Sequence, residues 1–299
     1  MKGRAQIRML PDGRRLHLND GPIDLIAQAF GDEREIEVAY RAAAARFVGV
    51  LDELCGELEL LRRPSCGRDE FFSGAIARRM ARAVAPYTAE TFITPMAAVA
   101  GAVAEEILLS MTSAAELARG YVNDGGDIAF HLAPGEKFVV GMVERPHQTS
   151  LFGTTTISSV DSIRGIATSG WRGRSFSLGI ADAVTILADS ATMADAAATV
   201  VANAVDLPGH PAIGRVAACE LAPDSDLGNR LVTQSVGELA PVEIREALDA
   251  GVRVAEGLCG SGLIRAVALR LQGETRLVGA DHQLEVVEAA PQNGRGVHA

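Results

Sequence analysis

Two oxygen-bearing side chains, four residues apart, are the residues of this sequence whose types and spacing best suit chemistry. Asp195 and Thr199 lie in SATMADAAATVVANAV, a stretch that predicts a helix over residues 189–205, and this spacing places both side chains on one helix face. A carboxylate and a hydroxyl suit a hard cation such as Mg²⁺, which takes oxygen ligands and keeps several waters. The alternative is a capping box, with Thr192 as the N-cap and Asp195 three residues later. The pattern leaves both interpretations open.

A glycine turn earlier in the chain supplies a further polar candidate. The block VNDGGDI, residues 122–128, predicts a strand, a turn and a strand. Gly125 and Gly126 tolerate the positive φ that such a turn needs. Asp127 begins the second strand, where it either holds the turn as an Asx residue or presents a polar group at the mouth of a site.

The block GIATSG, residues 165–170, is a third candidate. Thr168, Ser169 and Gly170 could present backbone N–H groups and hydroxyls to a phosphate. The sequence contains no Walker lysine motif, GxGxxG, HExxH or GxSxG. His147 lies in a predicted loop and is interpreted as a loop residue rather than a metal ligand.

The predicted elements that must position these residues form two similar halves, each with hairpins and helices, which hints at an internal duplication. Glu53, Glu57 and Glu59 fall off the apolar stripe of the first helix and are expected to be solvated. Thr94 is the expected N-cap of the third helix, and Gly101 in its interior suggests close approach of a backbone or a ligand. We predict a hairpin over 5–18, helices over 32–61, 69–85, 94–111, 189–205 and 241–258, and strands over 182–188, 263–271 and 275–278.

Composition limits the function classes. The chain has 299 residues, 48% of them hydrophobic, and a net charge of −10, which argues against nucleic-acid or anionic-membrane partners. Four cysteines without paired spacing predict reduced thiols in a cytoplasmic protein, and no secretory signal is visible. We expect a single domain over residues 1–290 and a disordered tail over 291–299.

Taken together, the three blocks resemble those of a known family. VNDGGDI is similar to the VNxGGDI block, GIATSG to the ATSG block, and SATMADAAATVV to the AD-then-AT block of ApbE-like proteins, the FAD:protein FMN transferases. The blocks occur in the family's order, and the specific similarity covers residues 94–205. The N-terminal part looks more like an uncharacterised cytosolic branch of this family.

The resemblance implies an α+β, T-fold-like architecture built from two related halves of antiparallel sheet packed with helices. It implies Mg²⁺ held by Asp195, Thr199 and the carbonyl of Ala167, with FAD as substrate or ligand. The transferases join FMN to a threonine of an acceptor protein and release AMP. The expected flavin-site residues are Gly101, Gly125, Gly126, Asp127, Thr168, Ser169 and Gly170.

The sequence departs from the family at one block. DLGGIAKGYAVD aligns with TPMAAVAGAVAE, residues 94–105, so Ala100 and Ala102 stand where the family has lysine and tyrosine. Three functions remain open: a Mg²⁺-dependent flavin transferase or FAD pyrophosphatase, a T-fold enzyme acting on a pterin- or purine-like ring, and a non-catalytic flavin-binding protein. A homodimer is also left open.

Overall fold

The computed structural model describes residues 4–143, 151–279 and 284–286. The strands are β1 (Gln6–Met9), β2 (Leu16–Asp20), β3 (Ile23–Phe30), β4 (Arg119–Asp124), β5 (Asp127–Leu132), β6 (Lys137–Val143), β7 (Leu151–Ser158), β8 (Gly165–Ser169), β9 (Ala183–Ala188), β10 (Ile213–Ala217), β11 (Leu231–Val236), β12 (Ala266–Leu271), β13 (Glu274–Val278) and β14 (Leu284–Val286). The helices are α1 (Glu33–Phe47), α2 (Val50–Gly56), α3 (Leu58–Leu61), α4 (Ala75–Val84), α5 (Val99–Ala114), α6 (Ala191–Ala204), α7 (Ala218–Leu221) and α8 (Pro241–Gly260), with short 3₁₀ turns at Ala85–Tyr87 and Pro95–Ala98.

Nine strands form one antiparallel sheet in the order β1-β2-β3-β4-β5-β8-β9-β12-β13. Two halves of the same plan build it: β2 and β3, then helices, then β4 and β5; and β8 and β9, then helices, then β12 and β13. The halves meet where β5 pairs with β8 through Ile128↔Ile166 and Ala129↔Gly165. The fold class is α+β, and the expectation of two related halves of antiparallel sheet is confirmed.

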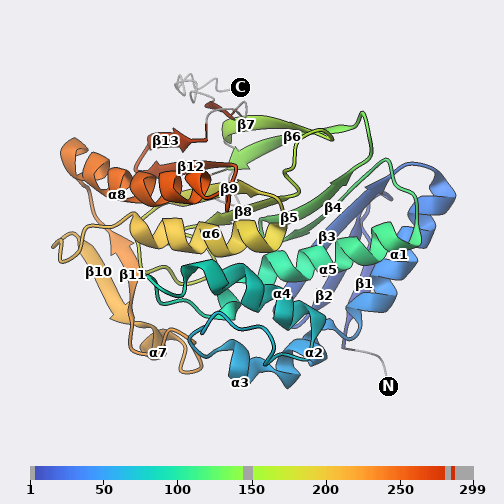
Figure 1. Cartoon of the computed structure of the whole chain (residues 1–299), viewed down its shortest axis with the longest axis horizontal. Helices are drawn as coiled ribbons and strands as arrows, with labels where there is room; N and C mark the ends of the chain where they lie inside the picture. The colour runs from blue at the N-terminus through green and yellow to red at the C-terminus, as the bar shows by residue number, and fades with distance from the viewer. Residues whose placement is uncertain (1–3, 144–150, 280–283, 287–299) are drawn as a thin grey trace, which may run out of the picture.

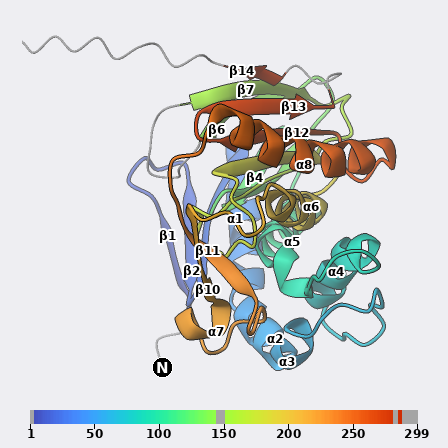
Figure 2. The same cartoon turned by 90° about the vertical axis from the view of Figure 1, so that its left-hand side faces the viewer.

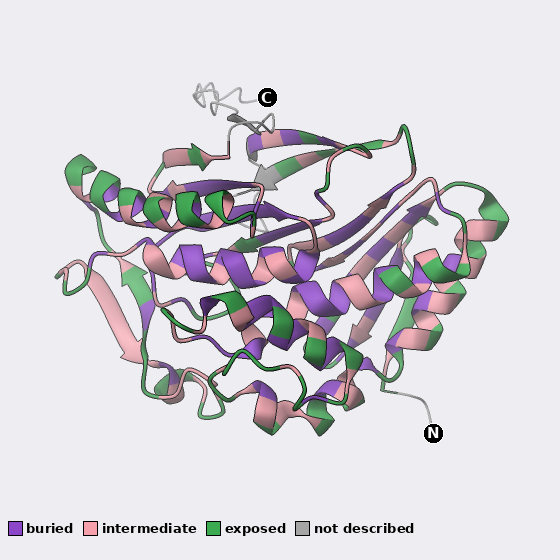
Figure 3. Cartoon of the chain, viewed as in Figure 1, coloured by how far each residue is buried: buried purple, intermediate pink, exposed green. Residues whose placement is uncertain are grey.

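Helices α5 and α6 lie across one face of this sheet (Figure 1). Small residues on several sides of both helices let them approach closely, and much of α6 is buried (Figure 3). The predicted burial of the third helix is confirmed at Val103, which is 1% exposed, whereas Val99 is half-buried. The segment Pro95–Ala114, with a mean hydropathy of 1.3, is long and apolar enough to cross a membrane. Here α5 packs against the sheet and α1, as a core helix does.

A small sheet of β14, β7 and β6 lies beside the other face (Figure 2). Phe138 of β6 packs edge-to-face against Phe30, Tyr121 and Phe130, with ring centroids 6.0–6.2 Å apart. Side chains of β5, β8, β9 and β12 join this cluster. The middle of the large sheet is therefore covered on both faces, which explains why β9 is buried along its whole length.

The long helix predicted over residues 32–61 is wrong, because the structure divides it into α1, α2 and α3. Gly49 precedes α2 and Gly56 ends it, as expected from the low helix propensity of glycine. The division lets Phe47, Val50 and Leu61 all reach the core.

The three glutamates expected to be solvated behave differently from one another. The Glu53 side chain is 26% exposed and pairs with Arg46 at 2.7 Å. Glu57 accepts the backbone N–H groups of Ser73 and Gly74 at 3.0 and 2.6 Å. Only Glu59 is largely exposed, at 86% of its side chain. Tertiary partners therefore hold two of the three carboxylates in place.

Two predicted helix starts also need correction. Helix α4 begins at Ala75 rather than Asp69, because the preceding segment is held by Glu57 in a non-helical path. Thr94 takes the N-cap position of a 3₁₀ turn that precedes α5, but its side chain does not cap, because its hydroxyl donates to the Asp226 carboxylate instead. His147 and the tail at 291–299 lie outside the described residues.

Candidate active site at the junction of the two halves

The N-terminal turns of α5 and α6 overlap side by side, and each receives a carboxylate from the other helix. Gly101 N–H donates to Asp195 Oδ2 at 2.9 Å. In return, Thr192 donates its hydroxyl and its backbone N–H to Glu105 Oε2, at 2.7 and 3.3 Å. The first N–H groups of a helix lack internal partners and carry the positive end of its dipole, so each carboxylate stabilises the opposite helix terminus.

This arrangement excludes one of the two interpretations of Asp195. The N-cap of α6 is Ser190, whose hydroxyl accepts Met193 N–H at 3.3 Å, so the capping box of Thr192 with Asp195 is wrong. Asp195 does cap a helix, but the helix is α5. The sequence could not reveal this, because the donor lies 94 residues away.

The backbone of α6 approaches Gly101 too closely for any side chain at this position. A Cβ there would lie 2.3 Å from the carbonyl oxygen of Ala191 and 2.9 Å from Thr192 N. Of the two alternatives for this glycine, the structure shows the close approach of a backbone. Gly170 is similar, since a Cβ there would lie 2.6 Å from the Asp182 carbonyl oxygen.

The glycine turn between β4 and β5 lies next to this helix junction. Gly125 has φ +65° and Gly126 has φ +120°, so the predicted positive φ is confirmed at both. Asn123, not Asp127, holds the turn, by accepting Gly126 N–H at 2.8 Å. Asp127 instead accepts Thr168 N–H at 3.1 Å and so links the turn to β8.

Three acidic side chains interact electrostatically at this place. Burial raises the pKa of Asp124 to about 7, against the opposing charge of Arg174. Burial also raises the pKa of Asp127 well above its usual value, and repulsion from Asp195 adds to the rise. The pKa of Asp195 is raised by burial and by Asp124, although the N–H of Gly101 opposes this. Asp127 and Asp195 keep part of their surface accessible to solvent.

The remaining predicted site residues lie on the same elements. Thr199 is half-buried, one turn after Asp195 on α6. Ala167 is buried, and continuing the register from Ile128↔Ile166 places it opposite Asp127. The Thr168 hydroxyl hydrogen bonds with that of Thr185 at 2.9 Å.

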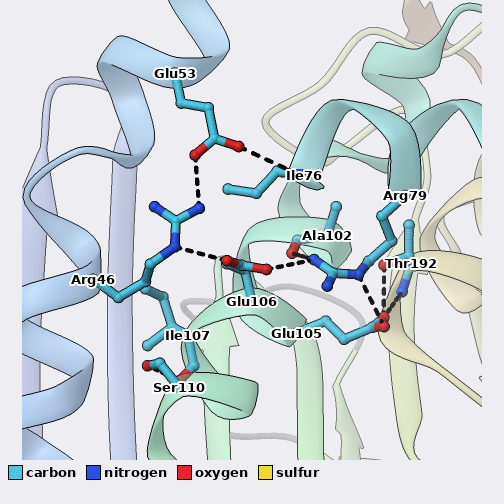
Figure 4. A network of polar contacts seen from close by, with 10 residues as sticks. All are labelled: Arg46, Glu53, Ile76, Arg79, Ala102, Glu105, Glu106, Ile107, Ser110 and Thr192. Carbon is cyan, nitrogen blue, oxygen red and sulfur yellow. Dashed lines mark hydrogen bonds and ion pairs between the residues drawn. The ribbon is translucent and has the colours of Figure 1, made fainter. Parts of the chain in front are cut away.

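Charged residues behind the helix junction were not singled out in the sequence. Arg79 of α4 contacts Glu105 at 3.2 Å and Glu106 at 3.0 Å, and Arg46 of α1 contacts Glu106 at 2.7 Å (Figure 4). The network therefore runs from α1 through α5 to Thr192 at the start of α6. These arginines and glutamates lie on separate helices, so the sequence does not indicate which arginine contacts which glutamate.

The donor set at the junction fits a hard cation. Among the described residues no three His, Cys, Asp or Glu side chains are grouped as metal ligands, which excludes a dense carboxylate or thiolate cage from this part of the chain. Mg²⁺ commonly takes one or two carboxylates and completes its shell with water. A cation at Asp195 would also relieve its repulsion with Asp127. Asp195, Thr199 and the Ala167 carbonyl would supply oxygen ligands.

Comparison with known proteins gives partial matches to curated archaeal sequences. A UPF0280 protein of Methanococcoides burtonii is 38% identical over 122 residues, covering 40% of this chain and 49% of the relative. A UPF0280 protein of Methanopyrus kandleri is 37% identical over 130 residues, covering 43% and 48%. The chain thus spans about half the length of these relatives.

The comparison with solved structures gives matches at low sequence identity. The apo form of the Pseudomonas stutzeri flavinyl transferase ApbE matches 92% of this chain and 94% of its own, at 10% identity and a TM-score of 0.43. The ApbE protein of Thermotoga maritima matches 83% and 76%, at 17% identity and a TM-score of 0.36.

A family model covers most of the chain. It is described as "AbpE bacteria" and matches residues 7–277, from β1 to β13. That range contains all three sequence blocks and both halves of the large sheet. The chain therefore belongs to this ApbE-like family.

Proposed function

We propose that this chain is a Mg²⁺-dependent flavin-handling enzyme. It transfers FMN from FAD to a threonine or serine hydroxyl of an acceptor protein, or it cleaves the FAD pyrophosphate with water, and AMP leaves in both reactions. Family membership supports the flavin. The observation that carries the proposal is the position of Asp195. Its carboxylate accepts the N–H of Gly101 and lies close enough to Asp127 to raise the pKa of that carboxyl.

The side chains have separate roles in this proposal. Asp195, Thr199 and the Ala167 carbonyl would hold Mg²⁺, and the bound ion would neutralise pyrophosphate charge and favour the departure of AMP. The hydrogen bond from Gly101 fixes the carboxylate rotamer of Asp195. Asp127 fixes the end of β8 through Thr168 N–H, so the glycine turn and the ATSG block stay in register.

The primary test is incubation with FAD and Mg²⁺, with and without an acceptor protein that contains threonine. Release of AMP together with free or protein-bound FMN is the expected result, and chelation should stop it. Tight FAD binding without turnover under any of these conditions would instead indicate the non-catalytic flavin-binding protein.

Two substitutions of Asp195 separate catalysis from helix capping. Asp195→Asn keeps an oxygen that accepts Gly101 N–H, and it removes a charge whose burial is costly. We expect turnover to be lost while stability is equal to or above wild type. Asp195→Ala should lose turnover and also about 1–3 kcal/mol, because the buried N–H loses its acceptor. Exposed Asp249 of α8 offers a control, Asp249→Asn. Full turnover in Asp195→Asn would refute the metal-ligand role.

A second candidate, an enzyme acting on another heterocycle such as a pterin or purine, is favoured by Ala100. This residue borders Asp195, since its backbone N–H also lowers the pKa of that carboxyl, and it stands where the family has lysine. Ala102, in contrast, is fully buried in the core. A pterin or purine that co-purifies with the protein would favour this candidate over flavin.

A further inference from the structure

The segment between β8 and β9 is anchored at both ends. Near its start, Trp171 N–H donates to the Ala181 carbonyl at 3.0 Å. At its end, Leu178 N–H donates to Asn203 Oδ1 at 2.9 Å, and Gly179 packs on α6, where a Cβ would lie 2.1 Å from the Ala202 carbonyl oxygen. Between these anchors, residues 172–176 are exposed. The segment therefore holds exposed side chains beside the candidate site.

The two arginines of this segment differ in what they contact. Arg172 Nε donates to Asp182 Oδ1 at 2.6 Å, and its guanidinium lies 4.4 Å from the centroid of the Trp171 ring. Arg172 is thus committed to holding the segment. The Arg174 side chain is 64% exposed, and its ion pair with Asp124 is long, at 3.8 Å. Most of the donors on the Arg174 guanidinium are therefore available to a ligand.

Arg174 also lies beside two of the acidic residues, Asp124 and Asp127. A Cβ on Gly125 would lie 2.8 Å from Arg174 Nη2, so the guanidinium rests on the glycine turn. The positive charge acts on both Asp124 and Asp127. An anionic ligand that approaches Asp124, Asp127 and Asp195 meets repulsion, and the guanidinium of Arg174 supplies a compensating positive charge beside Asp124 and Asp127.

We propose that Arg174 binds the phosphate groups of the ligand and makes the site specific for phosphorylated compounds. A guanidinium presents several N–H groups in a planar fork that matches phosphate oxygens. This inference rests on the proposed function for the identity of the ligand. It assigns phosphate binding to a residue outside all three sequence blocks.

The test compares flavins that differ in phosphate content. Binding of FAD, FMN and riboflavin is measured in the presence of Mg²⁺ for wild type, Arg174→Gln and Arg174→Lys. Arg34→Gln on α1, an exposed arginine, is the charge-matched control. We expect Arg174→Gln to raise the Kd of FAD about tenfold or more, with riboflavin unchanged. Arg174→Lys should fall between, because lysine keeps the charge but loses the fork. Unchanged melting temperatures would show that the variants are folded.

The outcomes separate this inference from the proposed function. Equal FAD affinity in wild type and Arg174→Gln, or an equal loss for FAD and riboflavin, would overturn the role of Arg174 while leaving flavin chemistry intact. If wild type binds no flavin, Mg²⁺ with inorganic pyrophosphate is the probe. Arg174-dependent pyrophosphate binding would then support the inference and reject the flavin, and absence of pyrophosphate binding would overturn both.

Discussion

Gly101 of α5 has no room for a side chain, and replacing it by alanine should force α5 and α6 apart. A Cβ would lie 2.3 Å from the carbonyl oxygen of Ala191, against about 3.4 Å for an ordinary contact, so the backbones must separate by roughly 1 Å. The same movement lengthens the bonds that join Gly101 to Asp195 and Thr192 to Glu105. The reciprocal caps of the two helix termini would weaken together.

Three contributions determine the expected change in the free energy of unfolding. Overpacking of a close contact costs about 1–3 kcal/mol, and partial weakening of the two caps together adds about 0.5–1.5 kcal/mol, the net contribution of roughly one hydrogen bond. Alanine regains about 1 kcal/mol of helix propensity relative to glycine. We therefore expect Gly101→Ala to lower the free energy of unfolding by about 1–3 kcal/mol.

Urea unfolding monitored by circular dichroism measures this change, and Gly257→Ala provides the matched control. Gly257 lies in α8, is exposed, and has no atom within 4 Å of an added Cβ. Gly257→Ala should therefore stabilise by about 0.4–1 kcal/mol. If Gly101→Ala is as stable as Gly257→Ala, the close approach of α5 to α6 is refuted, and with it the fixed orientation of Asp195.

Two further substitutions test the turn and the charged network. Gly126→Val should destabilise by about 1–3 kcal/mol through backbone strain at φ +120°, whereas an equally stable variant in thermal denaturation would contradict the strained turn. For Glu106, burial opposes ionisation, but hydrogen bonds from Arg46 and Arg79 outweigh it and leave its pKa below the usual value. Its ionised form thus stabilises the fold above the unfolded pKa of about 4.3, and this contribution is lost as pH falls through the lower native pKa. Glu106→Gln should consequently lose less stability than wild type between about pH 5 and pH 3; parallel acid-unfolding curves would show that the network contributes nothing.

The elements with strong local signals could be predicted from the sequence. The turn at Gly125 and Gly126 followed from two glycines flanked by alternating strands, and α6 and α8 followed from their apolar patterns. The three blocks also indicated the family. Local backbone preference and hydrophobic periodicity act over a few residues, so a single sequence carries them directly.

The tertiary structure decided which group each polar side chain serves. The sequence contained Asp195 and Thr192 within one apparent capping box, but Asp195 caps α5 and Thr192 binds Glu105. Likewise the helix predicted over residues 32–61 is interrupted at Gly49. Three shorter helices bury its apolar residues better than one straight helix would. Contacts between segments about 90 residues apart depend on how β5 and β8 join the two halves. A local sequence pattern cannot encode how the two halves join. The pairing of β5 with β8 is what brings Arg174, in the segment after β8, beside the glycine turn.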